Sequence, residues 1–299
     1  MNYQQFQEHL AEEVRNRSEG RVEVRLKTVT KNNGVARRTI ILQDGKSSLH
    51  PSVCMDPYYE EYRKGVPVSH LANLLLERCT SYGKPELPEN FFRYYDEVRP
   101  AVFCKLVNRE KNEEALSGIP HADWLDLSIV YYYQIDHSIL PDASILIRNE
   151  HLAYWGIRER RLREDAWKNT VGKQEAVFCS LRSALAEMNV PAEDIAQEES
   201  PLYILTNRSK CFGAICICYP KKADEIAEKV GGSYYIIPSS IHECLILRAE
   251  EAYSPSSLNR MVREVNRTQL EPQEILSDHV YYFDALSHCI ESETDRPVS

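Results

Sequence analysis

The stretch from Leu202 to Asp284 alternates short apolar runs with amphipathic helical patterns. Runs rich in β-branched and aromatic residues, punctuated by Gly, Pro, Asn and Ser, are typical of strands. Apolar residues spaced three and four apart predict helices over 221–230 and 256–269, and Gly231 is placed to end the first of them. The predicted strands are 203–207, 213–219, 233–237, 242–247 and 279–283.

The amino-terminal region has patterns of the same kind. Phe6, Leu10 and Val14 recur at steps of four and predict an opening helix over 3–15. Apolar and polar residues then alternate on both sides of Lys31-Asn-Asn-Gly34, whose turn-forming residues predict a β-hairpin. A strand at 52–55, a helical turn at 58–63 and a helix over 67–79 complete this region.

The middle of the chain predicts strands and helices in alternation. The strands are 101–107, 124–135 and 143–148, and the last two form a pair around Asp136 to Asp142. Helices are predicted over 111–116, 149–172 and 175–188. Because the sheets are mixed and largely antiparallel, with amphipathic helices beside them, we expect an α+β fold made of two α/β-layer subdomains.

Two segments poor in apolar residues are candidate linkers. Tyr82 to Asn90 is rich in Gly, Pro and polar residues, and Pro191 to Pro201 is acidic. We therefore expect an N-terminal α+β region over 1–190 with a sub-boundary near 82–90, and a C-terminal domain over 200–285. Residues 286–299 are expected to be a frayed tail.

The composition narrows the classes of function. With 43% hydrophobic and 27% charged residues, the chain reads as a soluble globular protein. A formal charge of −9 opposes binding to a phosphate backbone, so nucleic acid is not an expected partner. The basic run from Arg158 to Arg163 is the exception, and it is interpreted as a solvated helix face.

The sequence also bears on location. It has no run of about 18 apolar residues and no amino-terminal signal pattern, so we expect no membrane association and a cytoplasmic protein. Nine cysteines, several in apolar contexts, are typical of buried free thiols in a reducing compartment. Cys216 and Cys218 are too close in sequence for a usual zinc knuckle, and strand alternation would place both on one face.

Several short motifs together resemble a family of uncharacterised intracellular proteins from Gram-positive gut anaerobes. The resemblance runs from about Gly20 to Asp284, and it implies a shared bacterial fold without an assigned activity. Its two motifs near the C-terminus are the most specific. The motifs are Lys31 to Val35, Tyr58 to Glu60, Asn108 to Asn112, Ile119 to His121, Asn149 to Gly156, Pro238 to Glu243, Val265-Asn266 and Leu276 to Tyr282.

The polar turns near the C-terminus are candidate sites of chemistry. If the turn at Ser240, His242 and Glu243 faces the turn at Asp278 and His279, two imidazoles and two carboxylates could bind a divalent metal or perform acid-base catalysis. The alternative is that these residues form turns and cap backbone groups. Ser240 with His242 is the one local pairing of a nucleophile with a base, but no Gly-x-Ser-x-Gly elbow is present.

Tyrosines offer a different kind of site. Consecutive residues of a strand face opposite ways, so each tyrosine pair should place one ring outward. Outward rings bury much area at small entropic cost and suit protein contacts. The candidate binding surface is Tyr131, Tyr133, Tyr234 and Tyr281.

With eleven glycines and no glycine-rich phosphate loop, the sequence gives no sign of a nucleotide cofactor. We therefore expect a non-enzymatic protein that binds another protein or itself and needs no cofactor. The alternative is a metal-dependent or acid-base hydrolase that uses the His242 and His279 turns, with a divalent metal as its cofactor.

Overall fold

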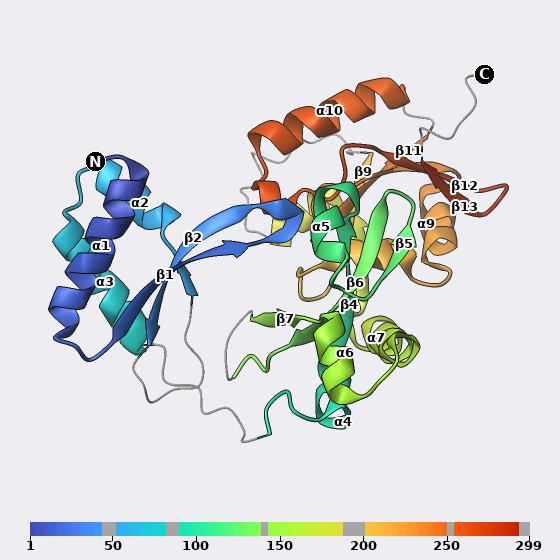
Figure 1. Ribbon diagram of the computed structural model, residues 1–299. Helices are drawn as coiled ribbons and strands as arrows, with labels where there is room; N and C mark the ends of the chain where they lie inside the picture. The colour runs from blue at the N-terminus through green and yellow to red at the C-terminus, as the bar shows by residue number, and fades with distance from the viewer. Residues whose placement is uncertain (44–51, 82–89, 139–142, 188–200, 250–253, 293–299) are drawn as a thin grey trace. The chain divides into compact units, whose positions relative to one another are not determined.

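The computed structural model describes residues 1–43, 52–81, 90–138, 143–187, 201–249 and 254–292 (Figure 1). The fold is α+β, as the sequence predicts, and its paired strands run antiparallel in the described residues. The chain divides into two compact units. Unit 1 is Met1–Phe91 with Asp136–Ala143, and unit 2 is Phe92–Ile135 with Ser144–Ser299.

Unit 1 is a three-stranded sheet, in the order β1-β2-β3, with helices packed against it. The predicted hairpin is confirmed, and Asn33 and Gly34 at its tip have φ of 60° and 67°. The elements are α1 (Tyr3–Ser18), β1 (Glu23–Thr30), η1 (Asn32–Gly34), β2 (Ala36–Gln43), β3 (Ser52–Cys54), α2 (Asp56–Arg63) and α3 (Val68–Ser81).

The core of unit 1 forms where α1 and α3 meet the sheet. Phe6 and Leu10 of α1, Leu71 and Leu75 of α3, and Ile40 of β2 are all buried. Burying these side chains supplies the main favourable free energy, which scales with the apolar area removed from water. The spacing of four residues between Phe6 and Leu10 therefore places both side chains on the buried face of α1, as the sequence pattern predicts.

Unit 2 contains two sheets. The first has the order β4-β6-β5. Strand β7 pairs with residues 132–134 of β6, beyond the residues of β6 that pair with β5. Its strands are β4 (Val102–Asn108), β5 (His121–Trp124), β6 (Leu127–Gln134) and β7 (Ser144–Leu146). The helices around it are α4 (Tyr95–Val98), η2 (Arg99–Ala101), η3 (Glu110–Asn112), α5 (Glu113–Leu116), α6 (Asn149–Trp155) and α7 (Glu159–Lys173).

The second sheet of unit 2 has six strands in the order β13-β12-β10-β11-β9-β8. Its strands are β8 (Ala176–Ser180), β9 (Leu202–Asn207), β10 (Tyr234–Ile237), β11 (Cys244–Arg248), β12 (Tyr281–Asp284) and β13 (Cys289–Ser292). The other elements are α8 (Leu181–Glu187), η4 (Gly213–Cys218), α9 (Lys222–Val230), α10 (Pro255–Thr268) and η5 (Pro272–Glu274).

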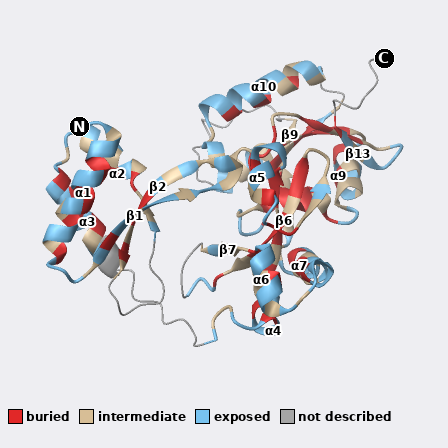
Figure 2. Ribbon diagram, viewed as in Figure 1, coloured by how far each residue is buried: buried red, intermediate tan, exposed pale blue. Residues whose placement is uncertain are grey.

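The two faces of the six-stranded sheet pack against different partners. Tyr234, Ile236 and Ile246 face the main core, which η4, α9 and the first sheet complete. Tyr235 and Leu247 face the opposite way and contact α10, whose outer surface is largely exposed (Figure 2). Strand alternation thus separates a large core from a smaller one beneath a single helix.

Three local predictions differ from the structure. Residues 213–218 form a 3₁₀ helix in place of a strand, because the fully apolar run is buried on all sides and so carries no period. Cys216 and Cys218 therefore do not share a strand face. The predicted helix over 175–188 begins with β8, whose apolar residues pair with the free side of β9. The predicted frayed tail from 286 contains β13, which pairs with β12.

The division between the units falls beside the sub-boundary expected near 82–90 and not at the boundary expected at 191–201. Residues 191–200 and 82–89, on which the predicted linkers fall, lie outside the described residues. However, β8 and β9 stand on either side of the 191–201 segment and are neighbours in one sheet. The chain from 92 onward therefore belongs largely to one unit, and the division lies near 91.

Candidate functional site

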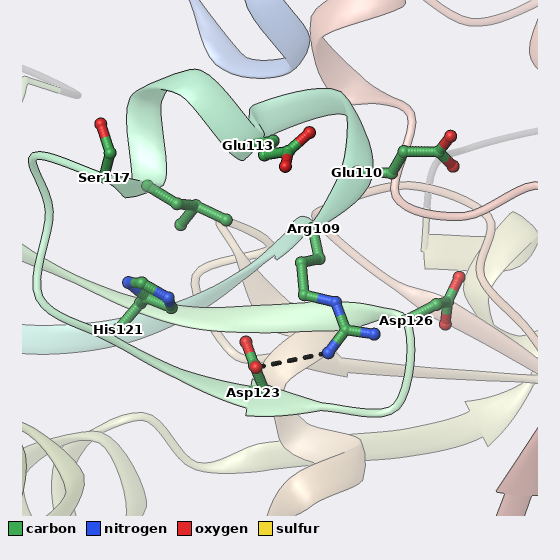
Figure 3. Close-up of a pocket in the computed structure, with 8 residues that line it drawn as sticks. Arg109, Glu110, Glu113, Ser117, His121, Asp123 and Asp126 are labelled. Carbon is green, nitrogen blue, oxygen red and sulfur yellow. Dashed lines mark ion pairs between the residues drawn. The ribbon is translucent and has the colours of Figure 1, made fainter.

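A polar pocket of about 510 Å³ lies on the first sheet of unit 2, where β4 ends (Figure 3). One wall comes from η3 and α5, and the other comes from β5 and the turn between β5 and β6. Figure 3 shows charged side chains extending from both walls. The lining residues are Arg109, Glu110, Glu113, Leu116, Ser117, His121, Asp123 and Asp126.

Asn108 fixes the start of the pocket wall that η3 and α5 form. Its side-chain oxygen accepts a hydrogen bond from the backbone N–H of Lys111 at 2.8 Å, and its carbonyl accepts one from the side chain of Asn112 at 2.7 Å. Asparagine at a strand end commonly closes a turn in this way. The chain therefore leaves β4 directly into η3, which places Arg109, Glu110 and Glu113 around the pocket.

Arg109 is the cationic member of the lining. Its guanidinium forms an ion pair with Asp123 at 3.4 Å, and both side chains are about half exposed, at 45% and 56%. Asp123 also accepts a hydrogen bond from Ser128 at 3.2 Å. In the described residues the Arg109 guanidinium donates no hydrogen bond, so most of its N–H groups remain available.

The remaining charges in the lining are negative. Glu110 and Glu113 form no ion pair with any described residue. The four carboxylates of the lining face one guanidinium, which leaves a formal charge of −3 when His121 is neutral. His121 Nδ1 lies 2.8 Å from the carbonyl oxygen of Ile119 and must donate to it, so the neutral ring carries its lone pair on Nε2.

Asp126 is held at the pocket's edge by two hydroxyl groups from the C-terminal segment. Tyr281 donates to one carboxylate oxygen at 2.6 Å, and Ser277 donates to the other at 2.8 Å. Burial raises the pKa of the Tyr281 hydroxyl, and the negative charge of Asp126 raises it further. Tyr281 therefore stays protonated and acts as a fixed donor to the carboxylate.

The same C-terminal segment is fixed by amide and ionic contacts. Asn108 donates to the carbonyl of Leu276 at 3.0 Å, and Asn266 donates to the carbonyl of Ser277 at 2.9 Å. Asp278 accepts from Lys111 at 2.8 Å and from Asn266 at 2.7 Å. Burial alone would raise the pKa of Asp278, but these two donors outweigh it and lower the pKa.

The metal site proposed from the sequence at His242, Glu243, Asp278 and His279 finds no support in the described residues. The ring Nδ1 of His242 accepts a hydrogen bond from the backbone N–H of Phe212 at 3.1 Å, and the backbone N–H of His242 donates to Ser240 Oγ at 3.0 Å. The backbone N–H of His279 donates to Ser277. Among the described residues no group of three or more His, Cys, Asp or Glu is placed to hold a metal. The expected metal site is therefore not formed, whereas acid-base chemistry at these residues stays a prediction.

The predicted tyrosine surface is also corrected. Tyr131, Tyr234 and Tyr281 are fully buried, and Tyr133 is half-buried. The strands that carry the three buried rings lie inside their sheets and are covered on both faces, so alternation places neighbouring rings in two cores. These rings pack inside the protein and cannot form a contact surface.

The cysteines of the described residues are free thiols. Burial raises the pKa of Cys104 to about 12 and that of Cys216 to about 11. It also raises the pKa of Cys244, which lies beside the His242 turn. A thiol with a raised pKa is a poor nucleophile at neutral pH, so these cysteines act as core residues.

Sequence reasoning missed the residues of the pocket, although it had noted some of the motifs that surround it. Four of the motifs that support the family resemblance meet here: Asn108 to Asn112, Ile119 to His121, Val265-Asn266 and Leu276 to Tyr282. Their contacts join residues up to 168 positions apart. No pattern of local spacing could have identified that convergence.

Comparisons with curated proteins and with solved structures give no match. None of the described helices is long and apolar enough to cross a membrane. A family model described as "Family of unknown function (DUF5688)" matches residues 3–285, which is nearly the whole chain. Since the match extends through both units and includes every residue of the pocket, the protein belongs to the DUF5688 family of unknown function.

Proposed function

We propose that the protein is a binding protein and that its pocket holds a positively charged group of a small ligand. The observation that supports this proposal is the lining, in which four carboxylates face one guanidinium. Two of the carboxylates, Glu110 and Glu113, have no ionic partner among the described residues. A concave surface lined by charge of one sign concentrates ligands of the opposite sign.

The network behind the pocket supports a functional role. Asn108, Asn266 and Ser277 are buried polar residues that connect β4, α10 and the segment before β12. Buried polar groups require complete hydrogen bonding and stabilise a fold less readily than apolar groups do. The hydroxyls of Ser277 and Tyr281 donate to Asp126, and the amide of Asn266 donates to Asp278.

Binding accounts for the geometry better than catalysis does. Ser117 is the one hydroxyl in the lining, and it donates to the backbone carbonyl of Glu114 at 2.7 Å. A catalytic serine would instead donate to a base such as His121. The hydrolase alternative at His242 and His279 is less well supported, because the His242 ring already accepts the backbone N–H of Phe212 and no metal-holding group forms in the described residues.

The proposal is tested by measuring thermal stability in the presence of cations. Putrescine, spermidine and arginine should each raise the unfolding midpoint with concentration at low ionic strength, and added salt should weaken the effect. Glu113→Gln removes one charge near the bound cation. That charge contributes about 1 kcal/mol at roughly 4 Å in a solvated setting, so the dissociation constant should rise about fivefold.

Glu114→Gln is the matched control, because Glu114 lies on the same helix but does not line the pocket. This variant should bind as the wild type does. The proposal is wrong if no amine shifts the midpoint, or if the two glutamine variants lose affinity equally.

A second candidate function is protein binding at an apolar groove beside α10. The groove has a volume of about 370 Å³ and lies between α10 and strands β9, β10 and β11. Met261 and Val265 line it and are 51% and 40% exposed. We propose an apolar segment of another protein as its occupant, since exposed apolar grooves commonly bind such segments.

A photocrosslinking residue tests this second candidate. Placed at Met261, it should form an adduct with another protein in native extract. Placed at Arg263, which is exposed on α10 and does not line the groove, it should not. Equal yields from the two positions would contradict docking at the groove.

We also propose a cytoplasmic location, supported by the free thiols of the described cysteines.

A further inference from the structure

Arg109 distinguishes this pocket from a purely acidic one. A guanidinium presents five N–H donors in a planar fork that matches the two oxygens of a carboxylate. Here the fork makes one ionic contact, to Asp123 at 3.4 Å, and donates no hydrogen bond within the described residues. The side chain is 45% exposed, so a ligand carboxylate can reach it from the pocket.

The pocket therefore offers two kinds of recognition at once. Arg109 fits an anionic group, while Glu110 and Glu113 fit cationic groups. A ligand that satisfies both needs a carboxylate at one end and at least two positive charges elsewhere, because the lining carries a formal charge of −3. Free basic amino acids have this distribution of charge.

The shape and the apolar part of the lining agree with that class. A volume of about 510 Å³ falls within the range of small-molecule sites, roughly 300–1,000 Å³. Leu116 lies among the charged residues of the lining and can contact the methylene chain of a lysine-like or arginine-like side chain. Figure 3 shows the Arg109 side chain extending from the start of η3 toward Asp123, with Glu113 on the helical wall that follows.

We propose that the ligand is a basic α-amino acid whose carboxylate binds Arg109 and whose amino or guanidino groups bind Glu110 and Glu113. This inference rests on the proposed function, which requires a cationic ligand. Polyamines lack the carboxylate and place positive charge beside Arg109. Acidic amino acids place a second carboxylate against the glutamates, so both classes should bind more weakly than basic amino acids do.

The test compares arginine with agmatine, which is arginine without its carboxylate, by isothermal titration calorimetry on the full-length protein. Arginine should bind at least tenfold more tightly than agmatine, and lysine should exceed cadaverine by a similar factor. Arg109→Met should reduce the arginine-to-agmatine ratio to below about two. In that variant agmatine should bind as tightly as in the wild type or more tightly, because a nearby positive charge is gone.

Arg160→Met is the matched control, because Arg160 is an exposed arginine on α7 that does not line the pocket. It should keep the wild-type ratio. Unchanged thermal midpoints and circular dichroism spectra must show that both variants are folded.

The outcomes separate this inference from the proposed function. Equal binding of arginine and agmatine to the wild type would overturn the carboxylate assignment and leave a general cation site. The same holds if Arg109→Met keeps the tenfold ratio. If neither compound binds, nor any polyamine, the cation site itself is wrong and this inference falls with it.

Discussion

Two buried tyrosines allow a direct test of how the pocket is supported. Both Tyr281 and Tyr131 are fully buried in unit 2. The hydroxyl of Tyr281 donates to Asp126 at 2.6 Å, whereas the hydroxyl of Tyr131 has no hydrogen-bond partner among the described residues. Replacing each tyrosine by phenylalanine removes one oxygen atom, so the two variants differ mainly in the hydrogen bond that is lost.

The expected changes have opposite signs. A hydrogen bond to a charged group contributes about 1.5–3 kcal/mol, and Asp126 keeps its second donor, Ser277. Tyr281→Phe should therefore lower the free energy of unfolding by about 2 kcal/mol. A buried hydroxyl without a partner costs about 1–3 kcal/mol, so Tyr131→Phe should raise stability by about 1 kcal/mol after a small packing loss.

Tryptophan fluorescence is a suitable probe of this effect. The three tryptophans, at positions 124, 155 and 167, all lie in unit 2, and Trp124 contacts the ring of Tyr281 at 5.8 Å between centroids. In a domain of this size, 1 kcal/mol corresponds to about 2–4 °C, so Tyr281→Phe should lower the melting midpoint by about 4–8 °C. Equal losses in both variants, or a larger loss in Tyr131→Phe, would refute the assigned hydrogen bonds.

Two further predictions concern unit 1 and the second sheet of unit 2. Burial would raise the pKa of Asp56, but hydrogen bonds from Tyr3 and Cys54 and the charge of Arg37 outweigh burial and lower the pKa below its usual value of 3.8. The ionised Asp56 therefore stabilises the folded state above that pH, and this stabilisation is lost as the pH falls through the lowered pKa. Asp56→Asn should therefore destabilise unit 1 at pH 7, and urea unfolding followed by circular dichroism should show the gap to wild type closing towards pH 3; a constant gap would contradict this. Gly213→Ala places a Cβ 2.5 Å from a backbone nitrogen of β9, and it should cost about 1–3 kcal/mol of unfolding free energy or more. Gly172→Ala, in α7 with open space around the new atom, should gain about 0.5–1 kcal/mol, and the reverse order would be inconsistent with the packing described.

Most of the secondary structure could be predicted from the sequence because its causes are local. The opening helix, the hairpin around Asn33 and the helix ending at Gly231 each have a strong period together with a turn or a stop residue. The segment 213–218 lacked such a signal, since every residue from Gly213 to Ile217 is buried. Its conformation is set by tertiary packing against β9 and β11.

The candidate site was not predictable in the same way. The sequence singled out Asp278 correctly as a polar residue before a strand, but its partners, Lys111 and Asn266, come from distant elements. His242 and Asp278 lie in turns of similar composition, and the local sequence does not show whether the two turns form one site. Burial of the tyrosines was likewise hidden, because it depends on the helices that cover each sheet.

We propose that the pocket at the end of β4 binds a basic amino acid, and direct observation of binding tests this. The most direct measurement is a titration of isotopically labelled protein with arginine, followed by amide chemical-shift perturbation. Saturable shifts are expected at residues 109–126, which line the pocket, and at 276–281, which donate hydrogen bonds to Asp126. Shifts that are absent, that do not saturate, or that cluster away from these residues would contradict it.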